Sequence, residues 1–180
     1  YLEVYGAEAD DIIATLCKYT QTEKDRSKNE KVMIVSGDKD FIQLQRYSNV
    51  DQYSPITKKY INGHDPITYI KEHILKGDTS DGVPNVLSPD HTFTEGLRQR
   101  PLSRKKIDTW IDIDMEDMTD EVKRNYQRNE KLISLDKIPE ELEDNILREF
   151  AGAPHGDRSK LLNYFIQTRL KSLTETIGEF

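Results

Sequence analysis

The stretch VMIVSGDKD, residues 32–40, decides the fold class of this chain. Its four consecutive apolar residues include three that are β-branched, a composition that favours a strand buried on both faces in a parallel sheet. Ser36 and Gly37 end the strand, and two aspartates follow at once. Ligands in open α/β sheets usually bind at the carboxyl ends of such strands. The stretch therefore predicts an α/β fold with a site at this strand end.

The sequence on either side of this strand predicts further short elements. A helix is expected over 7–20, a short helix over 39–44, and two more strands over 50–53 and 59–61. From Asp65 the pattern becomes helical, with helices expected over 66–76, 103–113, 115–129, 139–150, 158–168 and 172–177. The boundary between the two parts is predicted near Asn62 and Gly63. Because two or three strands seldom stand alone, we expect the sheet to be completed by residues before Tyr1 or by another chain.

The composition excludes some classes of function. Of the 180 residues, 33% are charged, and no apolar run is long enough to span a bilayer, so a membrane role is not expected. The single cysteine, Cys17, cannot form an internal disulfide, and its helical spacing from Ile13 predicts a buried thiol. The four histidines show no zinc spacing, so no chemistry is assigned to them: His64, His73, His91 and His155.

Three acidic clusters are candidates for chemistry. Glu8 and Asp10 open the first expected helix, Asp38 and Asp40 follow the strand, and the third cluster holds Asp78 with Asp81 in the loop after residue 76. Carboxylates without a histidine or cysteine cluster favour Mg²⁺, with Mn²⁺ as a second choice. Acidic residues at helix starts also serve as caps, and this alternative stays open for each cluster.

The order and spacing of three motifs resemble the 5′ nuclease family, which includes flap endonucleases and the exonuclease domains of bacterial DNA polymerases. The motifs are EADDII at 8–13, VSGDKDF at 35–41 and LKGDTSDGVP at 75–84. The likeness continues through the helical tail to LTETIGEF at 173–180, where it is most similar to the ribonuclease H branch of T4-like bacteriophages. The resemblance implies that residues 1–62 are the carboxyl-terminal part of a PIN-like, metal-dependent nuclease core. Residues 63–180 are then a helical DNA-binding domain with a helix-three-turn-helix motif.

The family resemblance also implies a reaction. It is the hydrolysis of RNA or DNA from the 5′ end with two Mg²⁺ ions, as in the removal of RNA primers during phage DNA replication in the host cytoplasm. Glu8 and Asp10 match the first metal group, Asp38, Asp40 and Asp78 match the second, and Asp81 contributes further. The family takes additional aspartates from an amino-terminal region that this sequence does not contain. We therefore expect the chain alone to cut poorly or not at all.

The expected nucleic-acid contacts lie in the second half of the chain. The resemblance assigns DNA-binding to the loop after residue 75, and a basic run at 98–106 adds a local patch that can bind phosphates despite the net charge of −7. The residues assigned are Lys76, Gly77, Thr79, Ser80, Gly82, Val83, Arg104, Lys105 and Lys106. NVLSPD at 85–90 departs from the family pattern, which leaves a K⁺ site in this motif open.

Partners and an alternative function complete the predictions. DNA and RNA–DNA duplexes, flaps and forks are the expected substrates, and a phage single-strand-binding protein and a sliding clamp are expected partners by resemblance. The alternative function is a non-catalytic module that binds duplex DNA or docks onto another protein while keeping the carboxylates.

Overall fold

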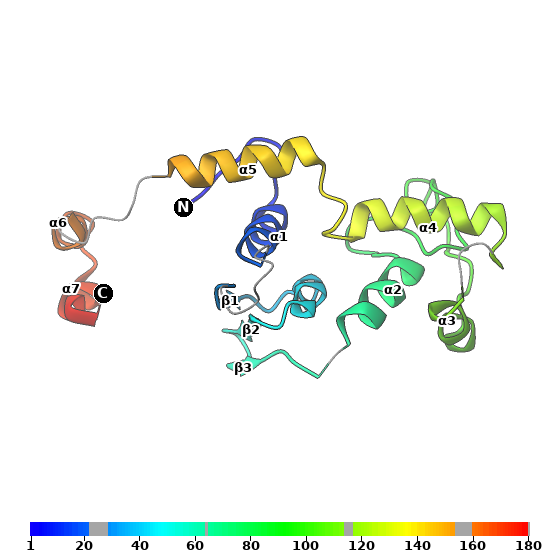
Figure 1. The fold of residues 1–180 in the computed structure, drawn as a ribbon, viewed down its shortest axis with the longest axis horizontal. Coiled ribbons are helices and arrows are strands. Elements are labelled where there is room, and N and C mark those ends of the chain that lie inside the picture. The colour runs from blue at the N-terminus through cyan, green and yellow to red at the C-terminus, as the bar shows by residue number, and fades with distance from the viewer. Residues whose placement is uncertain (22–28, 64, 114–116, 154–159, 180) are drawn as a thin grey trace.

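The computed structural model describes residues 1–21, 29–63, 65–113, 117–153 and 160–179. His64, His155 and the predicted helix starts at Met115 and Arg158 lie outside the described residues. A small α/β part, with α1 above the strands, lies beside a group of helices (Figure 1). The fold class predicted from the sequence, α/β followed by mainly helical structure, is confirmed at this level.

The sheet has three strands in the order β1, β2, β3. β1 (Val32–Val35) pairs in parallel with β2 (Val50–Ser54), and β2 pairs antiparallel with the short β3 (Lys59–Tyr60). The helix α1 (Ala9–Thr20) packs against β1 and places Cys17 in the core. This core consists of Ala14, Cys17, Ile34, Phe41, Leu44 and Val50.

The burial of β1 differs from the sequence prediction. Only Ile34 is buried, whereas Met33 is 45% exposed and Val35 is 64% exposed. Alternate side chains of a strand point to opposite faces, so one face of β1 packs on the core and the other meets solvent. The prediction that this strand is buried on both faces was therefore wrong.

Two elements follow the sheet and connect it to the helical part. The 3-10 helix η2 (Asp40–Arg46) begins at one of the predicted site aspartates, and α2 (Pro66–Lys76) packs against it. The Asp65 side chain caps α2 by accepting a hydrogen bond from the Thr68 N–H at 2.8 Å. Since α2 also packs against α3 and α4, it lies between the two parts of the molecule (Figure 1).

The remaining helices form the second half of the chain. They are α3 (Arg104–Ile111), α4 (Asp120–Ile133), α5 (Glu140–Gly152), α6 (Leu161–Gln167), α7 (Lys171–Glu175) and the 3-10 turn η5 (Ile177–Glu179). α5 packs across α1, where Lys18 pairs with Glu143 at 2.8 Å. Trp110 packs on a second core formed by Leu75, Val86, Ile107, Met118 and Val122.

The sequence misplaced the end of one helix, and the helix-three-turn-helix motif is not seen between α2 and α3. α4 extends to Ile133 rather than residue 129, because Val122 and Ile133 are both buried on its inner face. The resemblance implied a helix-three-turn-helix motif within residues 63–180. The structure instead has consecutive turns between α2 and α3, all within described residues. Within the parts of the chain that the structure describes, no helix has the length and apolar character to cross a bilayer.

Candidate metal centre and nucleic-acid interface

The turn after β1 holds Asp38 and Asp40 in fixed positions. The buried Gln52 side chain on β2 donates to the Ser36 carbonyl at 3.0 Å and also to the Asp38 carbonyl. Asp38 Oδ1 in turn accepts a hydrogen bond from the Asp40 N–H at 3.0 Å. A neighbouring strand therefore anchors the backbone that presents both carboxylates.

The loop after α2 presents Asp78. Gly77 ends the helix with φ 69°, a left-handed conformation that glycine tolerates, and Asp78 then bridges to Val83. Asp78 Oδ1 accepts hydrogen bonds from the Ser80 N–H at 2.8 Å and from the Ser80 hydroxyl. These bonds lower the pKa of Asp78 although burial opposes them, so this carboxylate remains ionised.

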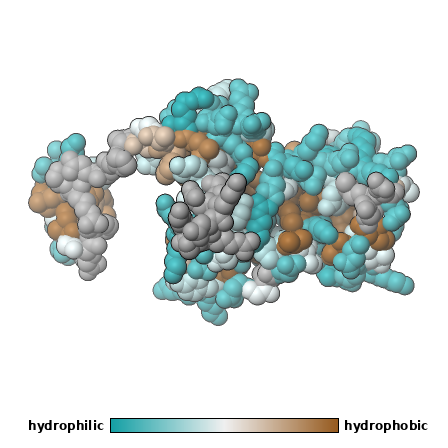
Figure 2. Space-filling view, in the orientation of Figure 1, coloured by the Kyte–Doolittle hydropathy of each residue, from teal (hydrophilic) through white to brown (hydrophobic). Residues whose placement is uncertain are grey.

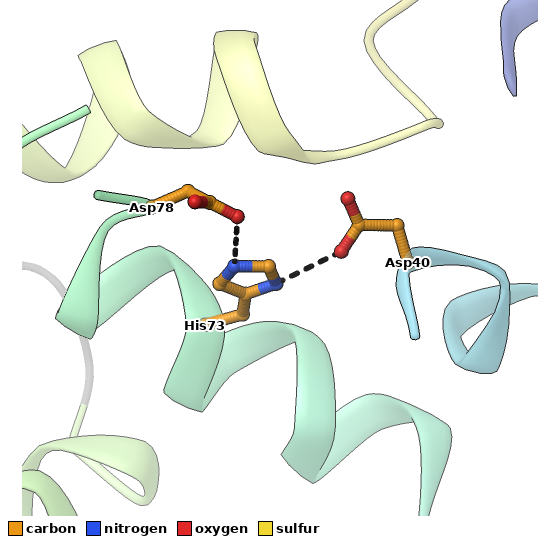
Figure 3. Close-up of side chains that lie close together, drawn as sticks. All are labelled: Asp40, His73 and Asp78. Atoms are coloured by element: carbon orange, nitrogen blue, oxygen red, sulfur yellow. Dashed lines mark hydrogen bonds and ion pairs between the residues drawn. The ribbon is translucent and has the colours of Figure 1, made fainter. Parts of the chain in front are cut away.

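His73 on α2 lies between the second and third acidic clusters (Figure 3). Its Nε2 is 3.2 Å from Asp78 Oδ2, and its Nδ1 is 3.4 Å from Asp40 Oδ1. The Nδ1 atom is enclosed by protein and has no hydrogen-bond partner of good geometry. Asp40, His73 and Asp78 each offer a donor atom within 4.8 Å of the others.

The first acidic cluster meets the second through Asp10. Burial, followed by the charges of Asp38, Asp40 and Glu8, raises the pKa of Asp10 to about 6. Burial also raises the pKa of Asp40, with the charges of Asp38, Asp78 and Asp81 acting in the same direction. All three clusters therefore act on one another electrostatically. Such a set of like charges is held together at a free-energy cost that bound cations reduce.

The two remaining acidic residues of the first cluster also have a structural role. Asp11 Oδ2 accepts a hydrogen bond from the Glu8 N–H at 2.9 Å, and the Glu8 side chain accepts in return from the backbone of Asp11. This is a capping box at the start of α1. The capping alternative left open for the first cluster is therefore seen at Glu8, together with its neighbour Asp11.

Sequence reasoning missed His73. The histidines have no zinc spacing, so His73 was assigned no chemistry. Its two partners are Asp78, five residues later in the chain, and Asp40, 33 residues earlier. The usable signal was its position one turn from the end of a helix that leads directly into Asp78. The donor set fits a divalent cation, because carboxylate oxygens of Asp40 and Asp78 converge on His73 and its enclosed Nδ1 has no hydrogen-bond partner.

The predicted nucleic-acid residues lie in two places, the loop that holds Asp78 and the start of α3. In the loop, the N–H groups of Ser80, Gly82 and Val83 donate to Asp78 or Thr79, so they already have acceptors within the loop. Thr79 and Gly82 are exposed, whereas Val83 is buried. Lys76 pairs with Glu72.

The last three residues of the basic run, Arg104, Lys105 and Lys106, begin the helix α3. Arg104 pairs with Glu72 at 2.8 Å and with Asp108 at 2.7 Å, and Lys106 lies 4.9 Å from the centre of the Trp110 ring. A groove of about 780 Å³ lies beside this run and apart from the carboxylates. Its walls combine Lys76, Arg98 and Arg100 with the apolar side chains of Phe93, Leu97, Leu102 and Ile107.

Comparison with known proteins agrees with the order of these motifs. Residues 1–73 match the 5′-3′ exonuclease N-terminal resolvase-like domain, and residues 65–180 match the family described as T4 RNase H, C terminal. The chain belongs to the T4 ribonuclease H family. It is 36% identical to the ribonuclease H of Enterobacteria phage T4 over 99% of its own length and 60% of that protein. The chain thus spans about three fifths of this relative.

Other relatives of this ribonuclease H family chain match about half of its length. A 5′-3′ exonuclease of Buchnera aphidicola is 39% identical over 47% of the chain and 30% of that protein. DNA polymerase I of Lactococcus lactis is 35% identical over 48% of the chain and 11% of that protein.

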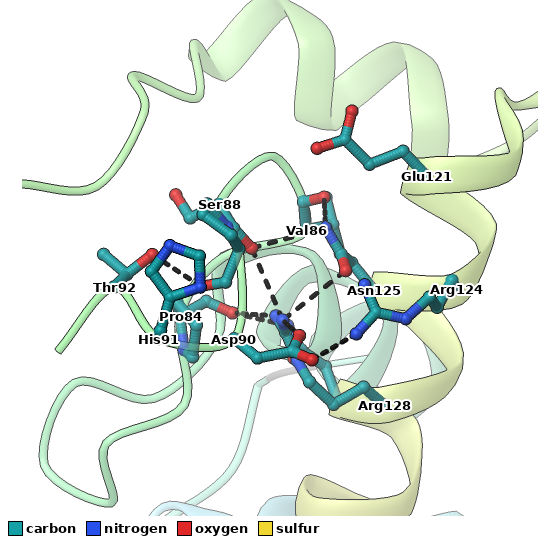
Figure 4. A network of polar contacts seen from close by, with 12 residues as sticks. Pro84, Val86, Ser88, Asp90, His91, Thr92, Glu121, Arg124, Asn125 and Arg128 are labelled. Atoms are coloured by element: carbon teal, nitrogen blue, oxygen red, sulfur yellow. Dashed lines mark hydrogen bonds and ion pairs between the residues drawn. The ribbon is translucent and has the colours of Figure 1, made fainter. Parts of the chain in front are cut away.

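In this ribonuclease H family member, α4 holds the segment 84–90 (Figure 4). The buried Asn129 side chain donates to the carbonyls of Ile74 and Pro84 at 2.8 and 2.9 Å. Arg128 donates to the Pro84 carbonyl at 2.8 Å, and Asn125 donates to the Val86 carbonyl at 3.0 Å. Buried carbonyls need such partners, so α4 fixes the path of the turns between α2 and α3.

Proposed function

We propose that this chain is part of a divalent-metal-dependent 5′-3′ nuclease that acts on RNA–DNA hybrids, duplexes and flaps. One observation carries the proposal: carboxylates from three separate segments converge in a member of the T4 ribonuclease H family. Phosphodiester hydrolysis needs such a site because two bound cations activate a water molecule and stabilise the leaving oxygen of an in-line displacement.

The described residues have distinct parts in this proposal. Asp38, Asp40 and Asp78 hold the cations from the strand end and the loop, Asp10 and Glu8 from the start of α1, and Asp81 supports the third cluster. Mg²⁺ is the proposed ion and Mn²⁺ a substitute, since carboxylate oxygens suit both. Because the family takes further aspartates from a region outside this sequence, we propose that the chain alone cuts poorly.

Nucleic-acid binding uses the second half of the chain in this proposal. The exposed side chains of Lys105 and Arg100 can reach phosphates, and the loop residues Thr79 and Gly82 lie beside Asp78. Phosphate contacts position a duplex without reading its sequence, as removal of primers in phage DNA replication requires. The proposal extends to a single-strand-binding protein and a sliding clamp as partners. Apolar side chains gather over α6 and α7, and this is the surface proposed for such a partner (Figure 2).

A nuclease assay tests the proposal. Labelled flap and RNA–DNA hybrid substrates are incubated with Mg²⁺, with Mn²⁺ and with EDTA, using this chain and a version extended at its amino end by the corresponding region of T4 ribonuclease H. We expect metal-dependent 5′ cleavage by the extended version, loss of cleavage in its Asp38→Asn variant, and weak cleavage by the chain itself. Duplex binding without cleavage by either protein would instead favour the non-catalytic module.

A further inference from the structure

In the contact between His73 and the two carboxylates, one ring nitrogen faces an oxygen acceptor with no proton between them, which is an electrostatic conflict. A neutral imidazole has one N–H donor and one lone pair, whereas an ionised carboxylate only accepts. Asp78 Oδ2 lies 3.2 Å from Nε2 in hydrogen-bonding geometry, whereas Nδ1 has no hydrogen-bond partner, so the geometry places the ring proton on Nε2. The lone pair of Nδ1 then faces Asp40 Oδ1, another acceptor, at 3.4 Å.

A cation between Nδ1 and Asp40 would remove this conflict. Two ligands that each lie roughly 2.1 Å from one ion are about 3 Å apart when they bind at right angles. The observed 3.4 Å is close to that separation. A proton on Nδ1 is the other possible cation, but this contact lacks the geometry of a hydrogen bond, and Nδ1 is enclosed.

The surroundings of the ring resemble those of a metal-binding histidine. Such a histidine usually donates its second N–H to a carboxylate, which fixes the ring and its tautomer. Asp78 occupies that position, and Tyr69 contacts the ring edge-on with centroids 5.9 Å apart. The helix end and the loop thus hold the ring with Nδ1 directed at Asp40 (Figure 3).

We propose that Nδ1 of His73 is a ligand of the metal centre and that, with Asp40, it makes this position favour a first-row transition ion over Mg²⁺. The proposal rests on the proposed function for the presence of a metal centre, and adds a nitrogen ligand to it. Imidazole nitrogen binds transition ions more readily than Mg²⁺, which retains oxygen ligands and water.

The test uses Mn²⁺ as the probe and the full chain. Pulsed electron paramagnetic resonance detects ¹⁴N coupling when a nitrogen ligand binds Mn²⁺, and titrations give the affinities for Mn²⁺ and Mg²⁺. His73→Gln keeps an amide donor for Asp78 but removes the nitrogen lone pair. His91→Gln is the matched control, because His91 lies in the turns between α2 and α3, where its partner is Glu95 rather than Asp40 or Asp78. Circular dichroism checks that each variant is folded.

We expect ¹⁴N coupling in the unaltered chain and in His91→Gln, and its loss in His73→Gln. That variant should also bind Mn²⁺ on the order of tenfold more weakly, with a smaller change for Mg²⁺. Bound Mn²⁺ without ¹⁴N coupling in the unaltered chain overturns the histidine ligand and leaves the proposed nuclease site intact, whatever the variants do. Absence of Mn²⁺ binding altogether overturns both this inference and the metal centre of the proposed function.

Discussion

Gly77 sets the position of Asp78 through its backbone conformation. Its φ is 69°, and a Cβ atom there would lie 2.6 Å from the carbonyl carbon of Pro84 and closer still to the Val83 oxygen. Gly82 has a similar φ of 73° but open space around it. A substitution at Gly82 therefore measures the cost of the positive φ alone, whereas the same substitution at Gly77 adds the cost of the clash.

We predict that Gly77→Ala lowers the free energy of unfolding by at least about 2 kcal/mol, and that Gly82→Ala lowers it by about 1 kcal/mol. Gly77→Ala should also weaken Mn²⁺ binding, because relief of the clash moves Asp78. Urea denaturation and Mn²⁺ titration measure the two effects. Equal losses of stability in both variants would show that the close approach to Val83 and Pro84 has no consequence.

Asp10 makes stability depend on pH. Its pKa of about 6 in the folded chain lies above the ordinary value of 3.8, so the folded state binds more protons between these values. The contribution of Asp10 to stability therefore falls as pH rises from about 4 to about 6. We predict that Asp10→Asn makes this fall smaller, and that Mg²⁺ raises the stability of the unaltered chain most above pH 6.

Urea denaturation between pH 4 and 7, with and without Mg²⁺, measures this dependence. Asp51→Asn is the control, because Asp51 is an exposed acid on β2. The prediction fails if Asp10→Asn and Asp51→Asn follow the same curve.

At the scale of residues, the sequence indicated the acidic clusters but not how they act together. Asp38, Asp40 and Asp78 could be named from their motifs. The position of His73 depends instead on how α2 packs against η2, and no local pattern encodes that packing. The pairing of Arg104 with Glu72 could not be predicted either, because no local pattern shows which residues of α3 meet α2.

Among the elements, α4 connects the two parts of the chain. Near its middle, Asn129 binds the carbonyls of Ile74 and Pro84. Just past its end, the Leu135 N–H donates to the buried Gln43 side chain of η2 at 2.9 Å, and Gln43 donates to the Ile133 carbonyl at 3.2 Å. One helix therefore fixes both the loop that follows α2 and the helix that begins with Asp40.

We predict that Asn129→Ala and Gln43→Ala each lower the free energy of unfolding by about 1–3 kcal/mol, because each leaves buried backbone groups without partners. Gln127→Ala on the exposed side of α4 should change it by less than about 0.5 kcal/mol. Chemical denaturation of the three variants provides the comparison. A loss for Gln127→Ala as large as for Asn129→Ala would contradict this explanation.

The elements that were predicted well are those with strong local signals. The bounds of β1 and α2 match the sequence prediction because an apolar run defines the first, and Asp65 followed by proline defines the start of the second. The turns between α2 and α3 could not be predicted, because their conformation depends on Asn125, Arg128 and Asn129 some forty residues later.

Across the whole molecule, charge is unevenly distributed. The chain has a net charge of −7, yet residues 98–106 contain five basic residues and no acidic one. We predict that the double substitution Arg104→Glu with Lys105→Glu weakens duplex binding and lowers the slope of log affinity against log salt by about 2. Lys105 should contribute more of this effect, since Arg104 already pairs with Glu72 and Asp108.

The control for this measurement changes the net charge equally elsewhere. Lys59→Glu with Lys171→Glu replaces two exposed lysines, one on β3 and one on α7. Binding of a labelled duplex at several salt concentrations compares the two variants. If both weaken binding alike, net charge rather than the basic run governs the interaction.

The sequence predicted the architecture of the whole molecule only in outline. Three motifs indicated the family, and the apolar strand at 32–35 with the helical pattern after Asp65 predicted the mixed α/β and helical arrangement. The boundary near Asn62 stays a prediction, because α2 contacts elements on both sides of it.

The exposed face of β1 has a practical consequence for anyone who handles this protein. β1 pairs only with β2 among the described residues, and Met33 and Val35 add apolar surface beside its second edge. An open strand edge with apolar neighbours is a template for strand addition between molecules. We predict that the chain self-associates through this edge in concentrated solution and that a charged replacement at Val35 reduces this association, which sedimentation velocity of the two proteins measures.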